Sequence, residues 1–162
     1  MEVAIRPLRE EDAYTSVKWR NDPEVFKFTG NTYKNEIKIE NELEWIHKVV
    51  ANSNDYRCAI LADGVYVGNI YLTDIDGKAA NYHIFIGNKE YWGKGVAKKA
   101  SLLILDYAFN TLKLETVKLK VRKENTSAFM LYKKLGFEVE NEENVWISME
   151  IKAYKRQPTC IS

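Results

Sequence analysis

Histidine and cysteine are scarce in this chain of 162 residues, which has two of each. His47 and His83 are too few for a histidine-rich metal site, and Cys58 and Cys160 lack the spacing of a metal-binding pair. Two such cysteines, one in an expected strand and one near the end of the chain, are typical of reduced thiols in the cytoplasm. We therefore expect no bound metal and a cytoplasmic location.

Excess charge of one sign and long apolar runs are also missing. Lys and Arg number 24 against 23 Asp and Glu, a formal net charge of +1, and the basic residues are scattered. This balance gives no argument for a nucleic-acid or anionic-membrane partner. No apolar run approaches the roughly 18 residues needed to cross a bilayer, and residues 1–6 lack the layout of a signal peptide. The length fits one domain with a sizeable core.

The stretch 81–100 changes from a strand pattern to a helical one across a glycine loop. Residues 81–87 are mostly aromatic, β-branched or apolar, and from Val96 the apolar residues recur at helical spacing. The first turn of a helix has unpaired N–H groups and partial positive charge, and Gly93 and Gly95 let a phosphate approach them. Positive charge in this stretch comes from Lys94, Lys98 and Lys99. The pattern indicates a pyrophosphate or another anion; alternatively, the glycines only make a tight turn.

Two better-known phosphate loops are excluded by spacing. The chain has no G-x-x-x-x-G-K-[ST], and Lys98 stands where G-x-G-x-x-G requires its third glycine. A nucleoside triphosphatase or a dinucleotide oxidoreductase is therefore disfavoured.

Two sequence blocks resemble one enzyme family. Trp92-Gly93-Lys94-Gly95-Val96-Ala97 is similar to the acyl-CoA loop [QR]-x-x-G-x-[GA] of the GNAT N-acetyltransferases, with Trp92 in place of Gln or Arg. That replacement is familiar in the branch that acetylates ribosomal-protein N-termini, polyamines and amino sugars. The block from Asn125 to Phe137 resembles the family signature N-x-x-A-x-x-x-Y-x-K-x-G-F. The chain is identified as a GNAT member, resembling ribosomal-protein N-terminal (alanine) acetyltransferases.

The expected fold is α/β: a single GNAT-type domain over residues 1–152, followed by a polar tail over 153–162. The resemblance implies a mixed, mostly antiparallel sheet of about six to seven strands with four helices, and a splayed parallel pair at the cofactor cleft. We expect strands over 2–7, 56–61, 65–71, 80–86, 116–121, 137–139 and 145–151, and helices over 9–20, 35–50, from 96 onward and over 125–135. Strands 80–86 and 116–121 should be parallel, because a helix connects them.

Side-chain directions follow from the helical spacing. In the first helix we expect Ala13, Tyr14 and Val17 to face inward, and a short turn or helix begins at Pro23 and ends at 30–31. In the second helix the outward residues should be Glu40, Glu42, Glu44 and Lys48. This acidic face is either simply solvated or borders the mouth of a pocket for a cationic substrate.

The family resemblance assigns the cofactor site to backbone more than to side chains. Acetyl-CoA would place its pantetheine along Ile84, Phe85 and Ile86, and a strand N–H near Phe85 or Ile86 would polarise the thioester. Its pyrophosphate would lie on the amides of Trp92, Gly93, Lys94, Gly95, Val96 and Ala97. Asn125 and Lys134 complete the expected cofactor contacts, although Asn125 has the alternative role of capping its helix.

The resemblance also implies catalytic residues. Tyr132 occupies the position of the family's general-acid tyrosine, and an unperturbed pKa of about 10 keeps it protonated at neutral pH; the alternative is a core tyrosine. Related enzymes often carry a Glu base where Asn81 aligns, but an amide cannot accept a proton. His83 shares a strand face with Asn81 and Phe85, and its unperturbed pKa of about 6.5 suits a base or water relay. Otherwise His83 is a packed or surface residue.

The acceptor side is expected to involve Asn81 and the segment W-R-N-D-P-E-V, in which Arg20 and Glu24 are the candidate substrate anchors, with Glu44 as a weaker one. The alternative for this segment is a packed aromatic corner that contains Trp19 and Phe26.

The function implied by the resemblance is direct acetyl transfer from acetyl-CoA to a primary amine. A protein N-terminal amine ranks first as the acceptor, a nucleotide-linked amino sugar second, and a polyamine or small amine third. The alternative is a non-catalytic acyl-CoA-binding regulatory module, which the missing Glu favours slightly and Tyr132 argues against. No nucleic-acid or membrane partner is expected, and a homodimer through the C-terminal strands is common in such proteins.

Overall fold

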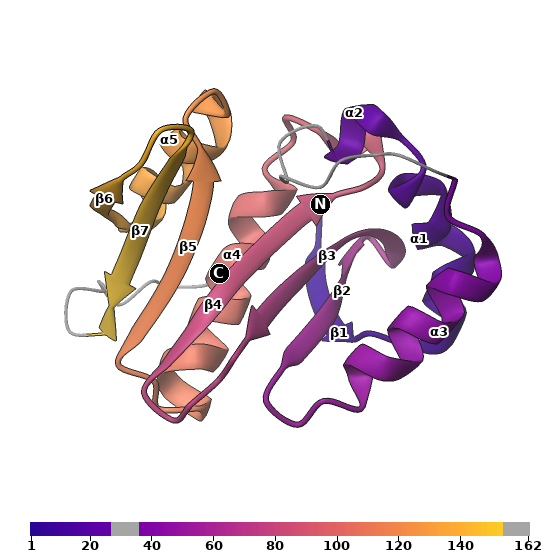
Figure 1. Cartoon of the computed structure of the whole chain (residues 1–162), viewed down its shortest axis with the longest axis horizontal. Helices are drawn as coiled ribbons and strands as arrows, with labels where there is room; N and C mark the ends of the chain where they lie inside the picture. Colours follow the sequence, from indigo (N-terminus) through magenta and orange to yellow (C-terminus); the bar gives the residue numbers. More distant parts are fainter. Residues whose placement is uncertain (27–35, 154–162) are drawn as a thin grey trace.

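A single sheet organises the chain, whose computed structural model describes residues 1–26 and 36–153. Within this part seven strands are joined in the order β1-β2-β3-β4-β5-β7-β6 (Figure 1). The strands are β1 (Val3–Pro7), β2 (Tyr56–Ala62), β3 (Val65–Thr73), β4 (Ala79–Ile86), β5 (Thr116–Arg122), β6 (Glu138–Glu142) and β7 (Trp146–Lys152). Neighbouring strands are antiparallel except β4 and β5, which are parallel. The predicted mixed sheet with one parallel pair is confirmed.

Five α-helices lie in the described part of the chain: α1 (Ala13–Arg20), α2 (Pro23–Phe26), α3 (Ile39–Val50), α4 (Val96–Asp106) and α5 (Thr126–Leu135). This is one more than the four predicted, because the segment after Pro23 forms a complete helical turn. Helix α1 is shorter than expected, since residues 10–12 form a 3-10 turn before it. Helix α3 begins at Ile39, so the predicted start at 35 is wrong, because residues 36–38 are described and are not helical. The predicted stop at 30–31 and the tail from 154 lie outside the described residues.

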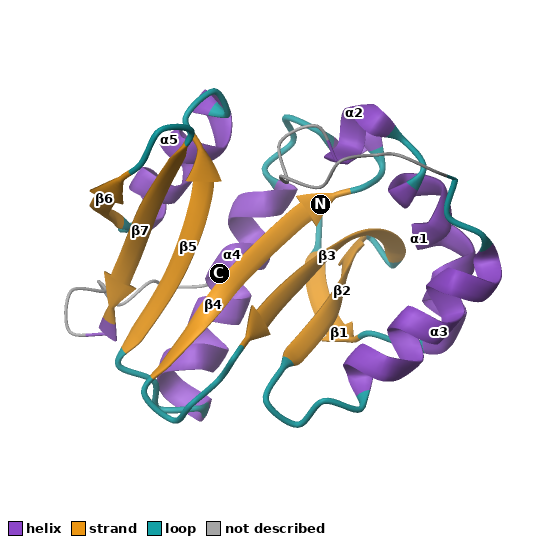
Figure 2. Ribbon diagram, viewed as in Figure 1, coloured by secondary structure: helices purple, strands orange, loops and turns teal. Residues whose placement is uncertain are grey.

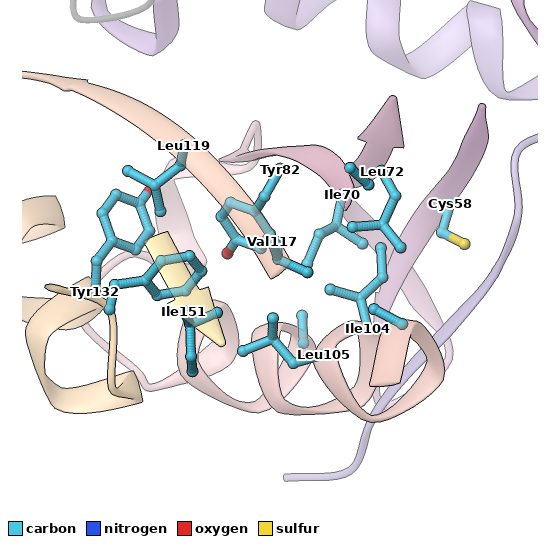
Figure 3. Close-up of a cluster of buried hydrophobic side chains, with 14 of the residues drawn as sticks. Cys58, Ile70, Leu72, Tyr82, Ile104, Leu105, Val117, Leu119, Tyr132 and Ile151 are labelled. Carbon is cyan, nitrogen blue, oxygen red and sulfur yellow. The ribbon is translucent and has the colours of Figure 1, made fainter. Parts of the chain in front are cut away.

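Helices cover both faces of the sheet, as Figure 2 shows, and each face has its own core. On the face covered by α4 and α5, the α4 side chains Ile104 and Leu105 lie against Ile70, Leu72 and Val117 of the sheet (Figure 3). On the opposite face a smaller cluster joins α1 and α3 to the sheet. Its buried members are Leu8, Ala13, Ile46, Ala59 and Tyr71.

Two expected side-chain directions are wrong. Tyr14 is 60% exposed, and α1 instead buries Ser16 and Trp19, which lie three and six residues after Ala13. Glu42 was expected to face solvent but is only 1% exposed. Its carboxylate is buried beside Arg20, with Arg20 Nε 3.3 Å from Glu42 Oε2.

The parallel pair separates after three residues. Ala79, Ala80 and Asn81 of β4 pair with β5, whereas the remaining five residues of β4 have no partner on that side. Tyr82, the first residue past the pairing, is buried; its hydroxyl lies 2.5 Å from Ser101 Oγ of α4 and its ring lies edge-on to Tyr132 of α5. Figure 1 shows the two strands starting side by side and then diverging, with β5 running toward α5 and β4 away from it. The sheet therefore has an open edge along the second half of β4.

Gly87, directly after β4, allows an aromatic ring to lie against the backbone. A Cβ at this position would come within 2.0 Å of the Trp19 indole. The same indole packs on Tyr66 at a centroid distance of 4.7 Å and edge-on to Phe85 at 6.1 Å. Trp19 thus attaches α1 to the end of β4, and its membership of the packed corner is confirmed. The side chain of Phe26 lies outside what the structure describes.

Candidate active site

A cleft of about 1340 Å³ opens where β4 and β5 separate. The glycine loop and α5 line one half of it, and parts of α1, α3, β2 and β3 line the other. Most of the predicted site residues are among its lining: Arg20, Glu24, His83, Ile84, Phe85, Ile86, Trp92, Gly93, Gly95, Val96, Ala97, Asn125, Tyr132 and Lys134. Lys94, Asn81 and Glu44 are not.

The loop before α4 presents a row of open backbone donors. Gly93 and Gly95 have positive φ angles of 74° and 81°, which glycine adopts without strain. The first N–H bonded back onto the helix start is that of Lys99, 3.2 Å from the carbonyl oxygen of Gly95. In the part of the chain that the structure describes, no backbone acceptor faces the amides from Gly93 to Lys98. Together with the helix dipole, these amides form a suitable anion site.

The three lysines near the loop point in different directions. Lys98 lines the cleft. The ammonium of Lys94 lies over the Tyr91 ring, 5.7 Å from its centroid, and Lys99 Nζ donates to the carbonyl oxygen of Met1 at 3.0 Å. In the half of the cleft lined by the glycine loop and α5, positive charge therefore comes from Lys98, with Lys120 and Lys134 on the other side.

Trp92 connects the glycine loop to the end of β4 through a hydrogen bond. Its indole Nε1 donates to the carbonyl oxygen of Ile86 at 2.8 Å. On the opposite side of the strand, the N–H of Gly87 donates to Val67 of β3 at 2.8 Å. Because backbone groups alternate sides along a strand, the N–H and C=O groups of Ile84 and Ile86 point into the split, and those of Phe85 point toward β3.

Tyr132 lies at the junction of the core and the cleft. It is 8% exposed, with its ring edge-on to Tyr82 and Phe137 at centroid distances of 5.8 and 5.9 Å. Burial raises the pKa of Tyr132 to about 12, so its hydroxyl stays protonated at physiological pH. Asn125, at the start of the same helix, accepts a hydrogen bond from the N–H of Ala128 at 3.3 Å. Asn125 is therefore a helix cap that also lines the cleft.

His83 is exposed in the other half of the cleft, with Nε2 3.1 Å from Thr73 Oγ1. The surrounding walls desolvate the ring and lower the pKa of His83 below its usual value, and Arg57 lowers it further. Asp74 and Asp55 act in the opposite direction. The net result is an imidazole that is neutral at pH 7.

Asn81 does not line the cleft but donates a hydrogen bond to a neighbouring aspartate that does. Its Nδ2 donates to Asp74 Oδ2 at 3.1 Å, and the N–H of Asp74 donates to Asp55 Oδ1 at 3.1 Å. Asp74 has a positive φ of 53°, which is uncommon for a residue other than glycine. The sequence interpretation missed both aspartates, because an aspartate next to a strand end is also a common turn residue.

Arg57 and Trp45 were also missed as site residues. Arg57 lies directly opposite Tyr71 in the β2–β3 register, and its guanidinium is 4.5 Å from the centroid of the Tyr71 ring. Trp45 of α3 lies against both Arg20 and Arg57, with centroid distances of 4.4 and 5.5 Å. A hairpin register would have placed Arg57 beside Tyr71, but only the folded helices bring Trp45 to them.

Glu24 lies at the rim of the cleft. Its carboxylate is 61% exposed and 3.9 Å from Lys89 Nζ, which also pairs with Asp22 at 2.8 Å. This surface network joins Lys89 to the rim of the cleft through Glu24.

Comparison with known proteins identifies the family. Residues 2–138 match the acetyltransferase (GNAT) domain. The chain belongs to this acetyltransferase family. This acetyltransferase is 32% identical over 143 residues to spermidine N(1)-acetyltransferase of Escherichia coli K12, covering 86% of this chain and 75% of that one. It is 27% identical over 136 residues to acetyltransferase PseH of Campylobacter jejuni, covering 84% and 83% of the two chains.

Solved structures show the same fold. Spermidine N-acetyltransferase from Vibrio cholerae in complex with CoA and spermine superposes with a TM-score of 0.84 at 24% identity, covering 94% of this chain and 96% of that one. PseH of Campylobacter jejuni in complex with acetyl coenzyme A gives a TM-score of 0.74 at 23% identity, covering 93% and 99%.

The acetyltransferase therefore uses acetyl-CoA as co-substrate and acts on an amine. The expected GNAT family is confirmed, whereas the comparisons do not single out the ribosomal-protein branch. Among the described residues, no cluster of three or more His, Cys, Asp or Glu could hold a metal ion. None of the helices in those residues is both long and apolar enough to cross a membrane.

Proposed function

We propose that the enzyme transfers acetyl directly from acetyl-CoA to a primary amine that lies between β4 and the wall formed by α3, β2 and β3. The observation that carries this proposal is the open edge of β4. Ile84 and Ile86 point backbone groups into the split, and the unpaired amides from Gly93 to Lys98 lie beside it. A pantetheine arm can bond to the strand edge while its diphosphate occupies the loop.

The N–H of Ile86 is the favoured oxyanion donor. The backbone of Phe85, the other candidate, faces β3, whereas the N–H of Ile86 faces the split. A donor held by the sheet requires no reorganisation when negative charge develops on the thioester oxygen.

Tyr132 acts as a hydrogen-bond donor to the departing sulfur. With a pKa of about 12, its hydroxyl is less acidic than a thiol, whose unperturbed pKa is about 8.5. Complete proton transfer from Tyr132 to the thiolate is therefore unfavourable. The proton that finally neutralises the thiolate comes from the acetylated nitrogen, which loses a proton when the amide forms.

His83 serves as the base, directly or through one water, and Asp74 attracts the incoming ammonium. A neutral imidazole at pH 7 can take the proton that the ammonium must lose before attack. Asn81 fixes the Asp74 carboxylate and is a positioning residue.

Replacing His83 with glutamine should lower kcat/KM at pH 7 by about a hundredfold, in the range of general-base contributions. Because the pKa of His83 is below 6.5, the parent enzyme should lose activity as the pH falls through that lower pKa, and the variant should lack this acid limb. The measurement is kcat/KM from pH 5 to 9. His47→Gln, which changes the surface histidine beside Glu10, is the matched control. An unchanged profile in His83→Gln would exclude this role.

We rank a small-molecule amine ahead of a protein N-terminal amine, which reverses the order suggested by the sequence. The relative at 32% identity is named for spermidine, which makes a polyamine one candidate. The other is a nucleotide-linked amino sugar.

Thiol release from acetyl-CoA should be measured with spermidine, an amino-sugar nucleotide and an alanine-starting peptide. We expect saturable release with at least one small amine, mass addition of one acetyl group to it, and no acetylated protein when the acceptor is omitted. Calorimetric binding of acetyl-CoA without transfer to any of these amines would contradict the proposal.

A further inference from the structure

The acceptor half of the cleft contains two arginines on one aromatic ring. Arg20 of α1 lies 4.4 Å and Arg57 of β2 lies 5.5 Å from the centroid of Trp45, and all three line the cleft. Two cations beside one indole repel each other, and this repulsion must be offset by nearby carboxylates. Each has one: Glu42 lies beside Arg20, and Asp55 beside Arg57.

Arg20 is held in place from inside the protein. The Glu42 side chain is 0% exposed, whereas that of Arg20 is 23% exposed. Burial raises the pKa of Glu42 and Arg20 opposes this shift, so the buried carboxylate depends on its partner to stay charged. The ion pair with Glu42 and the contact with the Trp45 indole together hold the Arg20 side chain in the wall of the cleft.

Part of the Arg57 guanidinium is available to donate hydrogen bonds to a ligand. Both Nε and Nη2 donate to the same oxygen of Asp55, at 3.2 and 3.0 Å. For the two N–H groups on Nη1, the part of the chain that the structure describes offers no acceptor. The side chain is 16% exposed, and its guanidinium lies over the Tyr71 ring, 4.5 Å from the centroid. A fixed planar guanidinium at the cleft surface is well suited to bind a phosphate or a carboxylate.

After the ion pairs are considered, the carboxylates in this half of the cleft can bind one ammonium group. Glu42 and Asp55 are paired with the two arginines, and Glu24 lies near Lys89. Among the described residues on this side, Asp74 is the cleft carboxylate whose hydrogen-bond donor is the neutral Asn81 amide. A polyamine would bring two or more further positive charges to a region where, among the described residues, the other cleft carboxylates already have cationic partners.

We propose that the acceptor is a monoamine that also carries an anionic group of the phosphate or carboxylate class, bound by Arg57 with Arg20 beside it. This inference rests on the proposed function, which places the reacting nitrogen near His83 and Asp74. The anionic group then lies near the reacting nitrogen, because Asp55 contacts both Arg57 and the N–H of Asp74. A nucleotide-linked amino sugar has this chemistry, whereas spermidine does not.

Uridine diphosphate, titrated into the enzyme saturated with CoA, tests the anion site directly. Saturating CoA fills the glycine loop, so the titration reports another anion site. We expect binding that Arg57→Gln weakens by about tenfold or more, with a similar rise in KM for an amino-sugar nucleotide. Arg57→Lys, which keeps the charge but loses the planar fork, should also weaken binding. Arg9→Gln, an exposed arginine outside the cleft, is the matched control.

Asp55 is 6% exposed and would lose its counterion in Arg57→Gln. The double variant Arg57→Gln/Asp55→Asn removes both charges and guards against a folding defect. Unchanged diphosphate binding in the double variant overturns the inference, as does a parent enzyme that acetylates spermidine faster than every anion-bearing amine. If spermidine is the preferred acceptor, the proposed acetyl-transfer function still holds and only the anion-bearing acceptor is excluded. Failure of all amines to release thiol would instead contradict the proposed function.

Discussion

Replacing Tyr132 with phenylalanine is expected to lower kcat by about a hundredfold, because the departing thiolate loses a hydrogen bond to a charged group. The affinity for CoA should change by less than about twofold, because the ring remains packed against Tyr82 and Phe137 and only the hydroxyl is lost. The measurement is kcat from thiol release, with CoA affinity from calorimetry. Since the pKa of Tyr132 is about 12, its loss should not change the pH profile below pH 10.

The matched control is Tyr14→Phe, because Tyr14 is 60% exposed and lies outside the cleft. It should keep parental kcat. A Tyr132→Phe enzyme with full turnover would reduce Tyr132 to a core residue, which is the other interpretation that its helical spacing permits. A loss of CoA affinity equal to the loss of kcat would point to repacking of the cleft.

Gly87→Ala should be the most destabilising single substitution tested, lowering the free energy of unfolding by about 3 kcal/mol or more, at the upper end for overpacking. The added Cβ would lie 2.0 Å from one indole carbon of Trp19 and 2.3 Å from another. The ring cannot move freely, because Tyr66 and Phe85 pack against it. Urea unfolding followed by fluorescence and by circular dichroism measures the change.

A double-mutant cycle separates this clash from other causes. In a Trp19→Leu background the smaller side chain leaves room for the Cβ, so Gly87→Ala should cost much less there. An equal cost in both backgrounds would mean that the backbone at residue 87, and not the indole contact, requires glycine.

The sequence predicted the elements whose signal is local. The turn at Asp63 and Gly64 joins the expected hairpin, and Gly136 ends α5 with a φ of 107°. The parallel pairing of 80–86 with 116–121 followed from the intervening helix and is confirmed, although only over its first residues. The split itself arises where Tyr82 packs between α4 and α5, a contact that joins three distant segments.

The errors came from weighing polarity above spacing. Glu42 lies three residues after Ile39 and four before Ile46, so helical periodicity places it on the inward face. Its charge led to the opposite prediction, because Arg20, the group that compensates the charge, belongs to another helix. The partnership of Asn81 with Asp74 likewise needed the β3–β4 register, in which Thr73 lies opposite Asn81. Contacts across elements decide such cases, and one sequence does not contain them.

The hydrogen bond from the Trp92 indole to the Ile86 carbonyl connects the glycine loop to the tip of β4. In the binding mode proposed above, this hydrogen bond fixes the distance from the diphosphate to the thioester, because the pantetheine arm has a constant length. Any acyl carbons beyond acetyl then extend forward into the volume where the amine must lie. In that binding mode, donor chain length and acceptor bulk would compete for the same space, and the Trp92 indole would link the choice of acyl group to the choice of amine.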